Sequence, residues 1–167
     1  MEDHDMEFRE ELLRIIEKNS RIDTKELAVI MGVTEDAVIE ELKQLEEEGT
    51  ICGYHTMINW DNLSTEKVTA LIEVKVTPQR GQGFDNIAER IYKYPEVESV
   101  YLMAGTYDLM VILEGKTIRE VSGFVAEKLS ALDTVTATAT HFILKKYKDH
   151  GTILAKKEED SREMITP

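Results

Sequence analysis

The hydrophobic periodicity of this chain changes near residue 60, and that change constrains the fold more than any other feature. Before it, apolar residues recur at the three- and four-residue spacing of helices, as in Phe8, Leu12 and Ile15. After it, residues 68–76 alternate apolar and polar side chains with the two-residue period of a half-buried strand. The sequence therefore predicts two domains, with boundaries at 1–60 and 68–146. A linker at 61–67 joins them, and a C-terminal extension covers 147–167.

The first domain is predicted to be helical. Helical spacing is found in residues 6–18, in a short segment from 24 to 32, and in residues 34–48. Thr24 and Thr34 stand where N-caps are expected, and Gly32 and Gly49 stand where the second and third helices end. Residues 51–58 alternate loosely around a glycine, so we expect a small strand pair there.

Three helices with a tight link between the second and third, followed by a small β element, predict a winged helix-turn-helix. Ala28 lies where the two helices would cross and where a larger side chain would not fit. Gly32 supplies the turn, and Val38 closes a small core. The alternative is a plain three-helix domain used for dimerisation.

The second domain alternates strands and helices. After the strand at 68–76, the pattern predicts a helix at 84–92, strands at 97–104 and 109–113, a helix opened by the capping box at 117–120, and a strand at 134–144. The four residues 105–108 are short enough to close a hairpin between the middle strands. The order is the ferredoxin-like βαββαβ pattern, and the fold class of the chain is α+β.

Net charge complicates the DNA-binding interpretation. The chain has 33 acidic and 20 basic residues, a formal charge of −13. Residues 1–60 hold 16 of the acidic and 6 of the basic ones, a net of −10. Because phosphate contacts supply most non-specific affinity, we expect weak and strongly salt-dependent DNA binding. The candidate DNA-contacting residues are Arg21, Lys25, Thr34, Glu35, Asp36, Ile39, Glu40, Lys43 and Gln44.

Other classes of site are not indicated by the sequence. His4, His55, His141 and His150 lie in separate elements without the paired spacing of metal ligands, so no metal site or cofactor is expected. Cys52 has no basic neighbour in sequence to activate it. No apolar run approaches the roughly 18 residues of a membrane span, and the acidic start does not resemble a signal peptide. A cytoplasmic location is therefore expected.

Three segments resemble the leucine-responsive/asparagine-responsive (Lrp/AsnC, feast/famine) transcriptional regulators. They read NSRIDTKELAVIMGVTEDAV, LEEEGTICGYHTMIN and VESVYLMAGTYDLMVIL. The resemblance covers residues 6–146 and implies a winged helix-turn-helix followed by a ferredoxin-like effector domain, known as a RAM domain. It further implies dimers formed through the strands, which assemble into octamers or similar rings. The chain departs from the family at the third helix, where members commonly carry basic residues.

The resemblance also implies where an amino-acid effector binds, namely between dimers. The effector candidates carried over are Gly105, Thr106, Tyr107 and Asp108, followed by Thr138 and Thr140. An α-ammonium group favours a carboxylate, and an α-carboxylate favours backbone N–H groups on a glycine-containing turn. The alternative is that residues 105–108 merely close a hairpin, with Tyr107 packing in an interface.

The sequence thus predicts an oligomeric, DNA-binding transcriptional regulator that responds to an amino acid or a related metabolite. The alternative is an effector-sensing oligomer with weak or no DNA binding, whose acidic first domain contacts a protein partner. Haem-pathway decarboxylases resemble the same two-domain arrangement, but their arginine and histidine pattern is missing from residues 99–113. No enzymatic activity is therefore expected.

Overall fold

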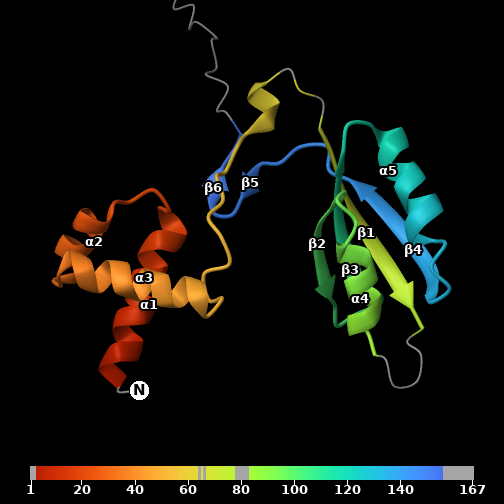
Figure 1. Cartoon of the computed structure of the whole chain (residues 1–167). Coiled ribbons are helices and arrows are strands. Elements are labelled where there is room, and N and C mark those ends of the chain that lie inside the picture. The colour runs from red at the N-terminus through yellow and green to blue at the C-terminus, as the bar shows by residue number, and fades with distance from the viewer. Residues whose placement is uncertain (1–2, 64, 66, 78–82, 156–167) are drawn as a thin grey trace, which may run out of the picture. The chain divides into compact units, whose positions relative to one another are not determined.

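A computed structural model describes residues 3–63, 65, 67–77 and 83–155 (Figure 1). The chain forms two compact units, divided between Ile58 and Asn59. The first is helical and the second contains an antiparallel sheet, so the predicted α+β class is confirmed.

The first unit contains three helices: α1 (Asp3–Lys18), α2 (Thr24–Met31) and α3 (Glu35–Glu47). The N-cap of α2 is Asp23, whose carboxylate accepts a 2.7 Å hydrogen bond from the amide of Glu26. The predicted cap at Thr24 is therefore wrong. A carboxylate one residue earlier reaches the orphan amide, and the hydroxyl of Thr24 instead donates to Glu35 at 2.6 Å.

The other signals for the helix-turn-helix are confirmed. Thr34 caps α3 by accepting from the amide of Ala37 at 3.3 Å. Gly32 ends α2 at φ 67°, in the left-handed region that glycine adopts without a steric cost. A small core joins the three helices, with buried apolar side chains at Leu12, Ile16, Leu27, Ala28, Val38 and Leu45.

The predicted strand pair at 51–58 is wrong, because these residues contain no strand. The amide of Ile51 donates to the carbonyl of Leu45, and the Ile51 side chain packs against the core. Residues 52–57 are exposed. An isolated strand pair needs a buried apolar face for stability, and these side chains do not provide one.

The second unit contains a four-stranded antiparallel sheet and two helices in the predicted order. The sheet order is β2-β3-β1-β4, which confirms the ferredoxin-like arrangement. In chain order the elements are β1 (Val68–Val76), α4 (Asp85–Tyr92), β2 (Val97–Leu102), β3 (Leu109–Gly115), α5 (Ile118–Phe124) and β4 (Val135–Phe142). A single 3-10 turn, η1 (Trp60–Asn62), precedes β1, and a π-helical turn, η2 (Val125–Leu129), extends α5.

Side chains alternate between buried and less buried along β1, so the core of the second unit lies on one face of the sheet. Ala70, Ile72 and Val74 are fully buried there, in the same core cluster as Ile91 of α4 and Val121 of α5. The remaining buried apolar residues of this core are Val76, Ile87, Leu109, Val111, Leu113, Phe124, Val125, Leu129 and Leu132. On the opposite face of the sheet, Leu71, Met110 and Ile112 are only half-buried and do not belong to this core.

Two details of the second unit differ from expectation. The apolar spacing of Phe84, Ile87, Ala88, Ile91 and Tyr92 predicts one inward helix face, but Tyr92, the last residue of α4, is 57% exposed. The extension at 147–167 contains a short hairpin that was not predicted, β5 (Lys148–Asp149) and β6 (Thr152–Ile153). Its turn takes positive φ at His150 and Gly151. The remainder of the extension, residues 156–167, lies outside the described residues.

Candidate functional site

Four exposed residues of α3, which we call the outward stripe, lie along its first two turns: Asp36, Ile39, Glu40 and Lys43. All four are exposed, and their spacing of three, four and seven residues places them on one helix face. The opposite face holds Val38 and Leu45, which are fully buried. If α3 enters a DNA groove, the outward stripe is the part that faces the bases.

Most other acidic residues on α3 have partners inside the first unit. The guanidinium of Arg9, on α1, contacts the carboxylates of Glu41 and Glu48 at 2.6 Å each. The bond from Arg9, together with one from Gln44, lowers the pKa of Glu48. These carboxylates lie on the side of α3 that faces α1, and Arg9 partly neutralises them. They therefore repel an anion at the outward stripe less strongly than the net charge of the first unit suggests.

The C-terminal half of α3 shows the same pattern. Glu46 accepts a 2.8 Å hydrogen bond from the hydroxyl of Tyr54, and burial with this bond raises the pKa of that phenol. The carboxylate Oε1 of Glu47 lies 3.7 Å from the ammonium Nζ of Lys43. In the part of the chain that the structure describes, Asp36 and Glu40 have neither a hydrogen bond nor an ion pair from their side chains.

The basic candidates lie at and just before the start of α2. Arg21 and Lys25 are exposed, and among the described residues their side chains form no ion pair. Thr34 and Glu35 are engaged in the cap of α3 and in the bond from Thr24. The amide nitrogen of Gln44 donates to Glu48 at 2.8 Å. Of the candidates predicted from the sequence, Arg21, Lys25, Asp36, Ile39 and Glu40 thus remain available to a ligand among the described residues, whereas Lys43 is paired with Glu47.

The candidate effector residues 105–108 form the turn between β2 and β3. The carboxylate of Asp108 accepts from the amide of Val76 at 2.8 Å, and the amide of Asp108 donates to the carbonyl of Val74 at 3.1 Å. The turn is therefore held against the end of β1. Gly105 and Thr106 are exposed, whereas Tyr107 and Asp108 are half-buried.

Thr138 and Thr140 lie away from this turn within one chain. They pair with Val74 and Ile72, so β1 separates them from β3. Two strand spacings amount to about 10 Å. Thr136, which is not among the candidates predicted from the sequence, lies closer to the end of β1. The hydroxyl of Thr136 donates to the carbonyl of Lys75 at 3.1 Å, beside a bulge at residues 75–76.

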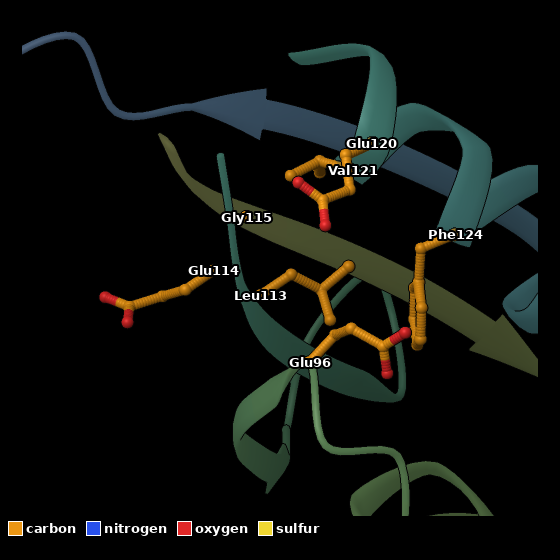
Figure 2. A pocket seen from close by; sticks show the side chains of 7 residues that line it. All are labelled: Glu96, Leu113, Glu114, Gly115, Glu120, Val121 and Phe124. Carbon is orange, nitrogen blue, oxygen red and sulfur yellow. The ribbon is translucent and has the colours of Figure 1, made fainter. Parts of the chain in front are cut away.

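A small hollow in the second unit does not coincide with the effector turn. Figure 2 shows it between the end of β3 and the start of α5, lined by Glu96, Leu113, Glu114, Gly115, Glu120, Val121 and Phe124. Its volume of about 10 Å³ is room for roughly one water molecule. One oxygen of Glu96 accepts from Lys128 at 2.6 Å, which lowers the Glu96 pKa. An amino acid does not fit in this hollow.

Two family models match the chain over these two units. The model described as Lrp/AsnC ligand binding domain matches residues 69–153, and a model described as winged helix-turn-helix DNA-binding matches residues 7–51. The chain belongs to the Lrp/AsnC family. The turn at 105–108 falls in the ligand-binding match, and the outward stripe falls in the DNA-binding match.

Curated relatives are named as regulators of transcription. The helix-turn-helix regulator YugG of Bacillus subtilis is 48% identical over 158 residues, covering 94% of this chain and 95% of that protein. The proline dehydrogenase transcriptional activator of Rhodobacter capsulatus is 32% identical over 127 residues, covering 76% and 82%. This Lrp/AsnC chain is a transcriptional regulator.

Solved structures share the fold. LrpA of Mycobacterium tuberculosis matches with a TM-score of 0.73 and 21% identity, covering 93% of this chain and 100% of that one. The regulator NMB0573 of Neisseria meningitidis, solved in complex with L-Met, matches with a TM-score of 0.68 and 22% identity, covering 85% and 91%.

Among the described residues, no group of three or more His, Cys, Asp or Glu side chains is arranged to hold a metal ion. No described helix is both long enough and apolar enough to cross a membrane.

Proposed function

We propose that this Lrp/AsnC regulator binds promoter DNA through α3 and the start of α2, and binds an amino acid at the 105–108 turn between two dimers. It acts in the cytoplasm and catalyses no reaction. The proposed effector site rests on the position of Asp108. One oxygen of its carboxylate accepts from Val76, and the half-buried side chain is thereby held in place.

The turn offers complementary groups for the two ends of an amino acid. The second oxygen of Asp108 makes no hydrogen bond within the described residues, so it can accept from an α-ammonium group. The amides of Gly105, Thr106 and Tyr107 make no backbone hydrogen bonds there either, so they can donate to an α-carboxylate. The turn lies on the surface rather than in an enclosed pocket, and a second dimer would complete the site.

The exposed face of the sheet supports the proposed oligomer. This face, opposite the core, presents the half-buried side chains of Leu71, Met110 and Ile112. Two such faces packed together form the dimer, and dimers then meet through their turns in an octamer or a similar ring. An effector that favours one arrangement of dimers shifts the population toward it, and so changes the spacing of the DNA-binding units.

Calorimetry with each standard amino acid tests the effector site. At least one is expected to bind, in agreement with the L-Met complex of the Neisseria regulator. Asp108→Asn keeps an oxygen that can accept from Val76 but removes the charge, so affinity should fall by about tenfold or more. The matched control is Asp133→Asn, at an exposed carboxylate of the same unit. Absence of heat with every amino acid, or equal affinity in both variants, contradicts the proposal.

A second candidate function is supported by the surface of α2. Val29 is 81% exposed and Ile30 is 52% exposed, which is unusual for neighbouring aliphatic residues and suits contact with a protein. In this alternative the first unit binds a protein partner and contacts DNA weakly or not at all. A gel shift with the DNA upstream of the chain's own gene at low salt separates the two. Absence of a shift favours the protein partner.

A further inference from the structure

The outward stripe presents an unusual set of chemical groups to a DNA groove. Asp36 and Glu40 offer two carboxylates that have no side-chain partner among the described residues. Ile39 offers an aliphatic surface that is 47% exposed, and Lys43 offers an exposed ammonium group that is paired with Glu47. The stripe covers the first two turns of α3, the part of a recognition helix that reaches base edges in helix-turn-helix proteins. Its side chains therefore restrict which bases the protein can accept.

A carboxylate accepts hydrogen bonds and cannot donate them. In the major groove, only the N4 amino group of cytosine and the N6 amino group of adenine are donors. Guanine presents two acceptors, and thymine presents an acceptor and a methyl group. Adenine places its N7 acceptor next to the amino group, so it repels the second oxygen of a carboxylate. Cytosine is the base that suits a carboxylate best.

The structure selects one carboxylate of α3 for this role. Glu35 accepts from Thr24, and the carboxylates of Glu41 and Glu48 contact Arg9. Glu46 and Glu47 are engaged by Tyr54 and Lys43. Glu40 remains, with a side chain one methylene longer than that of Asp36. It also adjoins Ile39, whose methyl groups can pack against the methyl group of a neighbouring thymine.

We propose that Glu40 reads a cytosine in the major groove of each operator half-site, and that Ile39 favours a thymine beside it. This proposal rests on the proposed DNA-binding function and specifies it. Guanine and thymine are rejected because their acceptors face a carboxylate, so discrimination comes largely from repulsion of the wrong base. Phosphate contacts from Arg21 and Lys25 supply the attraction. The protein is therefore selective but weak, with a steep dependence on salt.

Selection from a randomised DNA pool at low salt tests the assignment, with the full chain and two variants. The wild type should enrich duplexes with one fixed cytosine per half-site. Replacing that C·G pair with T·A should lower the wild-type affinity about tenfold. Glu40→Gln should lose the cytosine preference and gain one for adenine, because a glutamine pairs with the N6 and N7 edge of adenine.

Glu17→Gln is the matched control, because it removes one exposed carboxylate from the first unit, on α1. It should keep the cytosine preference even if its overall affinity rises with the lower negative charge. Enrichment without a fixed cytosine, or the same preference in wild type and Glu40→Gln, overturns the assignment and leaves the proposed function intact. Failure of the wild type to bind any duplex at low salt overturns both.

Discussion

The two units differ in how much of their stability rests on a few residues. Among the described residues, the core of the first unit consists of six buried apolar side chains, whereas that of the second consists of fourteen. The first unit also carries most of the acid, with a net charge of −10 over residues 1–60 against −3 over the rest. A small core and strong repulsion between like charges leave the first unit with a low free energy of unfolding. The same substitution in the core should therefore unfold a larger fraction of the first unit than of the second.

The units also differ in how they pair their charges. In the second unit Lys67 pairs with Glu114 and Lys128 pairs with Glu96, so each of these cations has one carboxylate partner. In the first unit one cation, Arg9, serves two carboxylates. The stability of the first unit should therefore depend more on individual residues than that of the second unit.

The largest effect is expected from matched truncations in the two cores. Leu45→Ala and Leu113→Ala each remove the same atoms from a side chain that is 1% exposed. Each should cost about 2–5 kcal/mol. Because the first unit has the smaller core, Leu45→Ala should unfold it near room temperature, while Leu113→Ala leaves the second unit folded. Hydrogen exchange resolved by segment measures both units in the same sample. Equal loss of protection in the two variants would show that the difference in core size has no consequence.

A smaller effect, with opposite signs in the two units, is expected from two glycines. Gly32 has φ 67°, so Gly32→Ala forces a β-carbon into the left-handed region at a cost of about 1 kcal/mol. Gly123 lies within α5 without positive φ, and an added β-carbon meets no atom within 4 Å. Gly123→Ala should therefore stabilise the second unit by up to about 1 kcal/mol. Denaturant unfolding followed separately in each unit measures both changes. The same sign in both variants would contradict this assignment of backbone conformations.

The smallest effect is expected from the charge network. Arg9→Gln leaves Glu41 and Glu48 without their cation, so the melting temperature of the first unit should fall near neutral pH. Arg14→Gln is the control, because the one ion pair of Arg14 within the described part of the chain is an exposed pair with Glu10, one helical turn away.

The effect of Arg9→Gln should also depend on pH. The folded-state pKa of Glu48 is lowered from 4.5, so the contribution of this pair is present above 4.5 and is lost as the pH falls through the lowered value. The difference between wild type and Arg9→Gln should accordingly shrink in acid. Thermal melts across this range provide the measurement, and a difference that is constant with pH would exclude the ion pair as its cause.

Local patterns in the sequence were sufficient to predict the main elements. Alternation in residues 68–76 gave β1, and Thr34 and Gly32 marked the ends of helices because caps depend on residues next to them. The errors occurred where local signals compete. Asp23 and Thr24 are both good caps, and only the structure shows which side chain reaches the amide. The hairpin at β5–β6 lacks a periodic pattern, because it is only two residues long on each strand.

The candidate sites were less predictable, because they depend on contacts between distant residues. The acidic character of α3 was evident from the sequence, but the pairing of Arg9 with Glu41 spans 32 residues and leaves no local pattern. The position of Thr138 also depends on strand order, since β1 lies between β4 and β3. The role of Asp108 in holding the end of β1 requires the register of three strands.

The double contact of Arg9 has a mechanical consequence. Glu41 and Glu48, the C-cap of α3, are seven residues apart, which is close to two full helical turns. The guanidinium therefore contacts the helix at two points along one line parallel to its axis. Because both contacts lie off the helix axis and on the same side of the helix, they resist rotation of α3 about that axis, and their separation along the axis also resists tilting of α3 away from α1. Arg9 thereby fixes the rotation of α3 about its own axis, and with it which side chains of this helix, including the outward stripe, point away from α1.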